Sequence, residues 1–577
     1  MVSRVWVDVP AEAAEVVATA AALGVPPVIA RLLVQRGLSD PDLARAFLQP
    51  DLTHLHDPFL LTGIREACAR ILQAVAAGER IVIHGDYDVD GITSTVMLRR
   101  GIEVLGGNVG HFVPDRHRDG YGLQPSTIER LHADGARLIV SVDCGIRATE
   151  AAHRARDLGV DLIITDHHEP EPELPPALAV LNPKRADCQY PEKNLAGVGV
   201  ALKLVQALMI QAGREADGLP HFVKIAAIGT LADVVPLTGE NRVIAHVGLA
   251  ALSRGPNGAG VEALLQECGL AAKAVDSFHI GFIMAPRLNA AGRMGSADAA
   301  LELLLMRGRD DATRAGAQSL ARQLTEENAR RQAEEAAIVA SARHVVDGDP
   351  DVGGHNLLVV AGDGWHRGVI GIVASKLTEA YHKPSLVLSV ADGIAHGSGR
   401  SISSFHLLEA LESCRDVFLK FGGHKQAAGV TLEASRIPEL RRRLTAWANE
   451  RLEPNDLVPR LRIDAPLGLR DISMDVLDGL TRMGPFGAGN PKPVFRASPI
   501  DLVSPPRRLK DRHLSLLVRQ DGRAFRAVAW RAIDRESYLV ANPSGLELAY
   551  SLEQGEYRGE KTTELTVADV RLPAGLL

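Results

Sequence analysis

Three short β-branched runs in the first half of the chain each lead directly into acidic residues. They read "IVIHGDYDVD" from Ile81, "RLIVSVDCG" from Arg137 and "DLIITDHHE" from Asp161. Strand and helix patterns alternate from about residue 79 to about residue 245, which predicts a mostly parallel sheet. Ligands bind beyond the carboxyl ends of the strands in such sheets, so the acids should meet at one rim. The pattern therefore predicts both an α/β fold and the position of a polar site.

The first acidic cluster has the spacing of a calcium-binding EF-hand loop, since Asp86, Asp88 and Asp90 alternate and precede Gly91. The twelfth position of an EF-hand loop should be a bidentate glutamate, but here it is Met97. The cluster also follows a predicted strand, whereas an EF-hand loop follows a helix. The residues after it have helical periodicity. Strand, acidic turn and helix favour an α/β site over a calcium loop.

The acids and their neighbouring histidines have the composition of a metal centre. Asp143 follows the second run, Asp166, His167 and His168 follow the third, and Asp233 lies in "IGTLADVVPL". Crowded carboxylates and imidazoles would repel and desolvate one another without cations. Mixed Asp/His ligation suits Mn²⁺ or Mg²⁺, and two such ions roughly 3.5 to 4 Å apart commonly hydrolyse phosphodiesters. A lone strand-end aspartate more often caps a helix, but three strand ends of this kind favour metal chemistry.

The chain of 577 residues is too long for one core and should divide into several domains. The predicted order is an N-terminal helical segment (1–60), a catalytic α/β domain (61–305), a long connecting helix (306–350), a second α/β domain (351–452) and a small C-terminal β-barrel (453–577). The connecting helix is expected because the sequence between about Asp310 and Val346 has no proline and no glycine after Gly316. The barrel is expected because short strand candidates alternate with Gly, Pro and Asp turns.

Composition argues against several classes of protein. No apolar run approaches the roughly 18 to 20 residues of a membrane span, and the first residues lack a signal-peptide core. The five cysteines are odd in number and include no CxxC pair, which favours a reducing cytoplasm and disfavours zinc. Net charge is −7, so any binding of nucleic acid would depend on local patches. One such patch lies between Arg496 and Arg535, with ten Lys/Arg against four Asp/Glu.

The acidic motifs, in their order, resemble those of the DHH phosphoesterase superfamily, and within it the RecJ branch of single-strand-specific 5′→3′ DNA exonucleases. The matching segments are "HGDYDVDGITST", "VDCG", "DHH" and "LADVVPL", then "PRLNAAGRM", "GSGRS", "GGHKQAAG" and "GPFGAGNPKPVF". The resemblance covers nearly the whole chain. It implies a DHH domain, a DHHA1 domain containing the "GSGRS" and "GGHKQAAG" segments, and a C-terminal oligonucleotide-binding (OB-like) fold. It also implies degradation of single-stranded DNA to mononucleotides with two Mn²⁺ or Mg²⁺ ions, in DNA recombination and repair.

The resemblance implies two metal sites bridged by Asp143. Their ligands would be His84 with an aspartate of the first motif at one site, and another first-motif aspartate with His167 and Asp233 at the other. Spacing in the wider superfamily selects Asp88 and Asp90, but the branch-specific spacing also permits Asp86, so this choice stays open. Asp166 would orient the histidines, and His168 would face the scissile phosphate as an electrostatic stabiliser or proton donor.

Other motifs suit substrate binding. In "GGHKQAAG" the glycines Gly422 and Gly423 let backbone approach a ligand, and His424 supplies a donor. Arg400 with Ser398 suits a terminal phosphate, because the guanidinium group binds oxygens bidentately. Further candidates for phosphate contacts are Arg116, Arg287 and Arg293. In the barrel we expect the basic face to bind DNA, and the aromatic residues Phe525 and Trp530 to lie in the core.

Two other functions are compatible with parts of the pattern. A DHH phosphodiesterase for short oligonucleotides or cyclic dinucleotides would share the chemistry, but such enzymes are usually shorter and lack the barrel. A non-catalytic DNA-binding scaffold would be expected to lose metal ligands, and the set here is intact. By resemblance, the expected partners are single-stranded DNA, single-strand-binding protein and a helicase. We expect a cytoplasmic monomer; the metal preference and processivity stay open.

Overall fold

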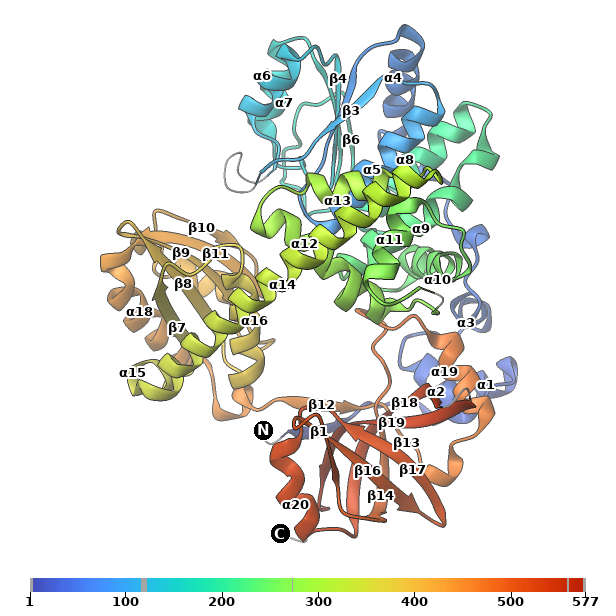
Figure 1. Cartoon of the computed structure of the whole chain (residues 1–577), viewed down its shortest axis with the longest axis vertical. Coiled ribbons are helices and arrows are strands. Elements are labelled where there is room, and N and C mark those ends of the chain that lie inside the picture. Colours follow the sequence, from blue (N-terminus) through green and yellow to red (C-terminus); the bar gives the residue numbers. More distant parts are fainter. Residues whose placement is uncertain (1–3, 116–121, 272, 558–559, 574–577) are drawn as a thin grey trace. The chain divides into compact units, whose positions relative to one another are not determined.

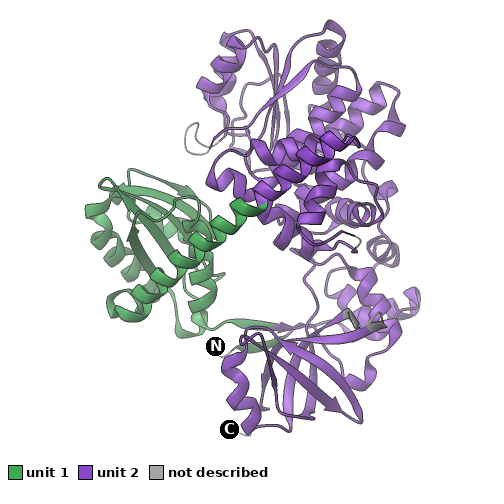
Figure 2. Cartoon of the chain, in the orientation of Figure 1, with its two compact units in different colours: residues 1–7, 325–461 green, residues 8–324, 462–577 purple. Residues whose placement is uncertain are grey.

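The computed structural model describes residues 4–115, 122–271, 273–557 and 560–573 (Figure 1). The chain forms two compact units (Figure 2). One comprises Met1–Val7 and Thr325–Leu461, and the other comprises Asp8–Leu324 and Arg462–Leu577. Each unit is described below by itself.

The larger unit contains a five-stranded parallel sheet. Its strands are β2 (Ile81–His84), β3 (Val109–Phe112), β4 (Leu138–Val142), β5 (Asp161–Thr165) and β6 (Ala179–Leu181), in the order β3-β2-β4-β5-β6. The strands predicted from the three acid-terminated runs are thus neighbours that point the same way. Their carboxyl ends lie at one edge, as expected of an open parallel sheet.

Helices cover both faces of this sheet (Figure 1). One face is covered by α4 (Ile64–Ala77), α5 (Val89–Val104) and α8 (Gly197–Gln211), and the other by α6 (Pro125–Ala133) and α7 (Thr149–Asp157). The lobe also contains α9 (Leu219–Ala232), α10 (Gly239–Arg254), α11 (Ala259–Glu267), the π-helix η4 (His279–Met284), α12 (Ala285–Met294) and α13 (Asp298–Leu305). Ile81 and Ile83 face the core formed with α5 and α8, whereas Val82 faces a separate core formed with α6 and α7. Burial on both faces explains why the strands are continuous apolar runs.

A 38-residue helix, α14 (Asp311–Gly348), belongs to both units and joins them in the chain. The smaller unit contains a mixed sheet in the order β10-β11-β9-β8-β7. Its strands are β7 (Leu358–Asp363), β8 (Ser385–Ala391), β9 (Ile394–Arg400), β10 (Lys420–Gly423) and β11 (Ala427–Glu433), and its shorter helices are α15 (Pro350–Gly353), α16 (Ile370–Tyr381), α17 (Leu407–Glu412) and α18 (Ile437–Arg451). Strands β7 and β8 pair in parallel and the other neighbours are antiparallel.

The C-terminal part of the larger unit is a closed five-stranded barrel. The strands run in the order β14-β18-β19-β17-β16, and β16 pairs with β14 to close it. The elements are β13 (Ala465–Pro466), β14 (Phe495–Leu502), β15 (Arg507–Leu509), β16 (His513–Gln520), β17 (Arg523–Ala529), β18 (Leu546–Tyr557), β19 (Glu560–Arg571), α19 (Met474–Met483) and α20 (Glu536–Ala541). The two α/β lobes, the long helix and the small β-barrel confirm the predicted fold class.

The N-terminal helices share a core with the barrel. They are α1 (Ala13–Leu23), α2 (Pro27–Val34) and α3 (Pro41–Leu48), and β1 (Val5–Asp8) pairs with β12 (Arg460–Ile463). Ile29 and Phe47 belong to the same buried cluster as Phe495 and Tyr550 of the barrel. The buried Arg242 of α10 donates hydrogen bonds to the carbonyl oxygens of Phe47, Arg482 and Gly484. The barrel is therefore tied to α10 as well as to the first helices.

The remaining short helical turns are η1 (Leu52–His54), η2 (Pro58–Leu60), η3 (Glu215–Asp217), η5 (Arg415–Val417), η6 (Ala434–Arg436), η7 (Pro454–Leu457), η8 (Leu469–Asp471) and η9 (Ile533–Arg535). Within the described ranges no single helix is long and apolar enough to cross a membrane, although α1 and α2, bent by 117°, pass that test as a pair on length and composition. All five cysteines are free thiols.

Candidate metal centre

The expected acids gather at the carboxyl edge of the parallel sheet. His84 ends β2, the first-motif aspartates follow it, Asp143 follows β4, the Asp166–His168 tripeptide follows β5 and Asp233 follows α9. Three groups of side chains each bring their ligand atoms within 4.8 Å of one another: Asp86, Asp88 and Asp143; Asp90, His167 and Asp233; and Asp143, His167 and His168. Asp143 and His167 each belong to two groups, so the groups are continuous.

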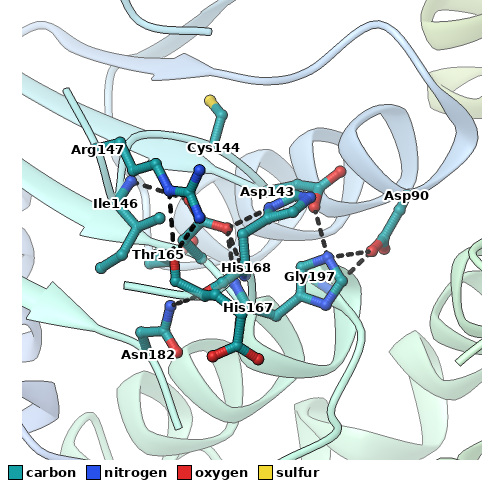
Figure 3. Close-up of polar contacts among 12 residues, drawn as sticks. Asp90, Asp143, Cys144, Ile146, Arg147, Thr165, His167, His168, Asn182 and Gly197 are labelled. Carbon is teal, nitrogen blue, oxygen red and sulfur yellow. Dashed lines mark hydrogen bonds and ion pairs between the residues drawn. The ribbon is translucent and has the colours of Figure 1, made fainter. Parts of the chain in front are cut away.

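His167 lies close to three of the acids in the cluster. Its Nε2 lies 3.1 Å from Asp143 Oδ1, 3.7 Å from Asp233 Oδ2 and 3.8 Å from Asp90 Oδ2. Figure 3 shows the His167 ring between Asp90 and Asp143. Among the described residues His84 is in none of the three groups; its Nδ1 lies 3.5 Å from Cys144 Sγ and its ring tilts against Phe112.

Two residues at the cluster have a left-handed backbone conformation. Asp143 has a φ of 57°, and Val234, directly after Asp233, has a φ of 63°. Non-glycine residues seldom adopt this left-handed conformation, and for a β-branched residue such as Val234 it is a clear outlier. Strain of this kind persists where the surrounding structure enforces it, and it clusters at functional sites.

Gly197, the first residue of α8, is a site residue that sequence patterns did not reveal. A Cβ atom at this position would lie 2.6 Å from Asp143 Oδ1 and 2.8 Å from Asp143 Cβ. Only glycine allows the start of α8 to approach Asp143 this closely. The sequence "AGVGVA" around it resembles ordinary small-residue helix packing, so the contact depends on the tertiary fold.

Asp90 differs from the other two aspartates of the first motif. Its two oxygens accept hydrogen bonds from the backbone N–H groups of Gly197 (2.7 Å) and Val198 (2.8 Å) at the N-terminus of α8 (Figure 3). Asp88 caps α5 by accepting from Gly91 N at 3.1 Å, and Asp86 Oδ1 accepts from Tyr87 N at 2.7 Å. Asp90 thus joins the N-termini of α5 and α8, where helix dipoles favour a negative charge.

Burial and mutual repulsion perturb the ionisation of the cluster. Burial, with the charges of Asp90 and Asp88, raises the pKa of Asp143 well above its ordinary range. Burial and Asp88 raise the pKa of Asp233 to about 7. Burial and the neighbouring His168 lower the pKa of His167 to about 4, so this imidazole is neutral. A neutral imidazole and carboxylates that repel one another are prepared to receive cations.

Asp166 serves the backbone and His168 rather than the cluster centre. Its Oδ1 accepts from the backbone N–H groups of His167 (2.7 Å) and His168 (3.0 Å) and lies 2.7 Å from His168 Nδ1; its Oδ2 accepts from Ile146 N at 2.9 Å. Although burial alone would raise the pKa of Asp166, these bonds lower it. Burial would lower the pKa of His168, but the hydrogen bond and charge of Asp166 outweigh this effect and raise the pKa of His168.

The cluster fits divalent cations with oxygen and nitrogen ligands. Asp143 Oδ1 and His167 Nε2 are buried and make no hydrogen bond in the described part of the chain. Such unsatisfied buried atoms are costly, and a cation would satisfy both. Burial raises the pKa of the nearby Cys144 thiol, which keeps it protonated and a poor ligand. The donor set suits Mn²⁺ or Mg²⁺.

A pocket of about 170 Å³ opens beside these acids. It is lined by Asp86, Tyr87, Asp88, His168, Asn289, Gly292 and Arg293. Arg293 is therefore placed at the site as expected, whereas Arg287 is outside this lining and donates to Ile283 O of its own helix. Two α12 residues that sequence reasoning missed fix α12 to the acidic turn. Asn289 Oδ1 accepts from Val89 N at 3.1 Å, and a Cβ at Gly292 would lie 2.6 Å from Tyr87 O.

The expected phosphate-binding residues of the second α/β domain lie in the smaller unit. Ser398 and Arg400 are on β9, and Arg400 Nη1 donates to Ser398 Oγ (3.2 Å) and Gly399 O (2.8 Å). Gly422 and Gly423 end β10, and His424 N donates to Ala427 O to close the turn to β11. A Cβ at Gly422 would meet no other atom within 4 Å, so the space around this position does not by itself require glycine. Arg116 lies outside the described residues.

The aromatic residues of the barrel correct one expectation. Phe525 packs partly against the barrel core, but Trp530 is 57% exposed and was wrongly expected to be buried. Its ring contacts His513 edge-on, with centroids 4.9 Å apart. Trp530 follows β17 directly, where the chain leaves the barrel wall, so the alternation of inward and outward side chains no longer applies to it. Several basic residues nearby form ion pairs, among them Arg508–Glu536 and Arg526–Glu564.

Comparisons with known proteins agree with the geometry. Family models match the DHH family, N-terminal domain (residues 80–230), the DHHA1 domain (354–450) and the RecJ OB domain (463–569). The single-stranded-DNA-specific exonuclease RecJ of Bacillus subtilis is 37% identical over 95% of this chain and 68% of its own length. The corresponding Escherichia coli protein is 33% identical over 94% and 96%.

Solved structures show the same similarity. The crystal structure of RecJ in complex with Mn²⁺ from Thermus thermophilus superposes with a TM-score of 0.82 at 33% identity, covering 99% of this chain and 80% of that one. The Mg²⁺ complex from the same organism has a TM-score of 0.77 at 32% identity and covers 99% and 78%. With the matching motifs, domains and acidic cluster, these findings show that the chain belongs to the RecJ family of the DHH superfamily.

Proposed function

We propose that the protein is a metal-dependent exonuclease that degrades single-stranded DNA from the 5′ end to mononucleotides, in DNA recombination and repair. The observation that carries this proposal is the continuous Asp/His cluster around Asp143, in a chain that is similar over most of its length to single-stranded-DNA-specific exonucleases. A relative solved with Mn²⁺ and with Mg²⁺ supports these cations. The closed barrel supports a long substrate rather than a dinucleotide.

The two metal sites would share Asp143. We assign His84 and Asp86 to one ion, because the ligand atoms of Asp86 and Asp143 lie within 4.8 Å and His84 ends the adjacent strand. For the other ion the assigned ligands are Asp88, His167 and Asp233. The ligand atoms of Asp88 lie within 4.8 Å of those of the shared Asp143, and His167 Nε2 lies 3.1 Å from Asp143 Oδ1 and 3.7 Å from Asp233 Oδ2. Asp90 is left out, although its Oδ2 lies 3.8 Å from His167 Nε2, because both its oxygens already hold the amides of α8.

When bound, the cations would activate water for attack and stabilise the leaving oxygen. The residues of this chain would then hold the substrate in line. Asp166 keeps His168 oriented and favours its protonated form, so that His168 would donate a hydrogen bond or a proton to the phosphate. Arg293 lines the same pocket and would bind a phosphate oxygen.

The 5′ end would be bound by residues of the smaller unit. Burial and its two hydrogen bonds hold the Arg400 guanidinium group beside Ser398, an arrangement that suits a terminal phosphate. Gly422, Gly423 and His424 would bring backbone and ring donors to the same ligand. Arg116 and Arg287 are proposed as further phosphate contacts along the strand. We also propose that the protein acts as a cytoplasmic monomer, together with single-strand-binding protein and a helicase.

The decisive experiment compares the wild-type protein with Asp143→Ala on single strands labelled at either end, in Mn²⁺ or Mg²⁺. The wild type should release mononucleotides from the 5′ end only, and the variant should release none while still binding the strand. Asp187→Ala, which removes an exposed carboxylate paired with Arg185, is the matched control and should be fully active. Undiminished digestion by Asp143→Ala would refute the metal assignment.

A further inference from the structure

Two exposed aromatic residues precede α12, the helix that carries pocket-lining residues, and have no role in the proposed chemistry. Phe278 is 58% exposed and Phe282 is 73% exposed. Their rings stack on one another, with centroids 5.1 Å apart and planes inclined by 24°. Contiguous exposed apolar surface marks binding sites more often than single exposed apolar residues do. We call these two residues the aromatic pair.

The aromatic pair continues the helix face that reaches the pocket. Phe278 directly precedes the π-helix η4, Phe282 lies within it, and α12 follows without a break. Spacings of three or four residues place Pro286, Asn289 and Arg293 on the same face as Phe282. None of these three is fully buried, whereas Ile280, Met284 and Leu288 on the other side of the helix are. The exposed face therefore leads from the aromatic pair to Asn289 and Arg293, two of the residues that line the pocket.

The pair is held on a well-anchored backbone. Ser277 Oγ donates to Phe486 O at 2.7 Å, and His279 Nδ1 lies 2.7 Å from Asp276 Oδ1, which together position the start of the helix. The stretch itself is a π-helix, a rare conformation that occurs frequently at functional sites. Anchoring of this kind lowers the entropy lost when a ligand binds to the rings.

We propose that Phe278 and Phe282 form a stacking platform for the bases of the single strand that enters the metal centre. This inference rests on the proposed nuclease function. Phe282 lies about 10 Å along the helix axis from Asn289, since seven residues separate them at about 1.5 Å each. Phe278 lies four residues further along the helix, at about 16 Å from Asn289. At about 3.4 Å per stacked nucleotide, the rings meet bases about three to five nucleotides beyond the scissile phosphate.

A base-stacking role explains features that a protein partner would not. Stacking needs only ring faces, and single strands bind without sequence preference in this way. A protein interface buries roughly 800 Å² on each partner, far more than two phenylalanine rings can provide. The aromatic pair also lies on the helix face that carries Asn289 and Arg293 of the pocket. The ligand of the pair should therefore be one that also enters the pocket.

The test compares Phe278→Ala/Phe282→Ala with the wild type on 5′-phosphorylated dT12 and dT3. We expect KM for dT12 to rise about 5- to 100-fold, the range typical of alanine substitution at stacking residues, with kcat unchanged. For dT3, which ends before the platform, KM should be unchanged. The single variant Phe282→Trp should keep the wild-type KM for dT12, whereas Phe282→Leu should raise it. An equal loss on dT12 and dT3, or no loss on either, would overturn the proposal.

A second measurement separates this inference from the nuclease function. Binding of fluorescein-labelled dT12 is measured by anisotropy in the inactive Asp143→Ala protein, with and without the two Phe→Ala changes. A single abasic site at each position in turn should weaken binding only opposite the platform, and only when both rings are present.

If the wild type degrades nothing but this dependence on the abasic position holds, the nuclease proposal fails and the platform stands. If abasic sites act equally in both proteins, the platform fails. Leu43→Ala, an exposed apolar change on α3, is the matched control and should leave binding unchanged.

Discussion

Replacing Gly197 with alanine should damage the metal centre far more than it damages the fold. The added Cβ would lie 2.6 Å from Asp143 Oδ1, closer than real Cβ atoms approach other atoms, so Asp143 or α8 must shift. Asp143 has little freedom to adapt, because its backbone already has a φ of 57°. The first turn of α8 has little freedom either, because Asp90 accepts hydrogen bonds from both Gly197 N and Val198 N.

Two magnitudes follow from this geometry. Overpacking a buried position costs about 1 to 3 kcal/mol, which corresponds to a fall in Tm of about 2 to 12 °C for a domain of this size. A displacement of about 1 Å in a reacting group costs about 100-fold in rate. We therefore expect Gly197→Ala to remain folded at 25 °C, with kcat reduced about 100-fold and weakened Mn²⁺ binding. Exonuclease kinetics, thermal melting and calorimetric titration with Mn²⁺ measure these effects.

Two matched controls separate the site from the fold. Gly110→Ala adds a Cβ where no atom lies within 4 Å and should change neither Tm nor kcat. Gly101→Ala places a Cβ 2.9 Å from Val205, away from the metal centre, and should lower Tm while leaving kcat within about threefold. If Gly197→Ala had wild-type kcat and Mn²⁺ affinity, the close approach of α8 to Asp143 would be irrelevant to function and the reasoning would be refuted.

Three other predictions concern charge, packing and DNA binding. The pKa of Asp233 in the folded protein, about 7, exceeds its ordinary value of 3.8, so the stabilising contribution of Asp233 is present at low pH and is lost as pH rises through 7. The Tm of the EDTA-treated protein should therefore fall between pH 5 and pH 8. Addition of Mn²⁺, or the change Asp233→Asn, should reduce that fall. Arg242→Met removes the donor to the carbonyl oxygens of Phe47, Arg482 and Gly484 and should cost about 1 to 3 kcal/mol, measured as a lower Tm than that of the exposed Arg254→Met control. Trp530→Ala removes an exposed ring and should weaken binding of single-stranded DNA about 5- to 100-fold at unchanged Tm, measured by anisotropy.

Each of these has an outcome that contradicts it. A Tm that is independent of pH in EDTA would show that the acids do not repel one another in the folded protein. A Tm of Arg242→Met equal to that of Arg254→Met would show that α10 does not depend on these bonds to the barrel. Unchanged DNA affinity in Trp530→Ala would restrict base stacking to other parts of the chain.

Short-range sequence signals were sufficient to predict the sheet and the edge at which the acids gather. A strand such as Ile81–His84 is buried on both faces, so it is marked by a continuous β-branched run. Parallel connection then places residues far apart in the chain, such as Asp143 and Asp166, at the same edge. The long helix was likewise predictable, since the absence of proline is a local property.

Tertiary structure alone decided which groups meet the acids. Asp90 accepts a hydrogen bond from the backbone N–H of Gly197, a residue 107 positions away, and the proposed choice among the first-motif aspartates depends on this bond. Asn289 reaches Val89 across 200 positions, and Ile29 shares a core with the barrel strands. No local pattern records such contacts, because hydrophobic periodicity shows which face of an element is buried but not what it is buried against. The amino-acid sequence therefore determined the elements and their acids, and packing between distant segments determined which groups each acid contacts.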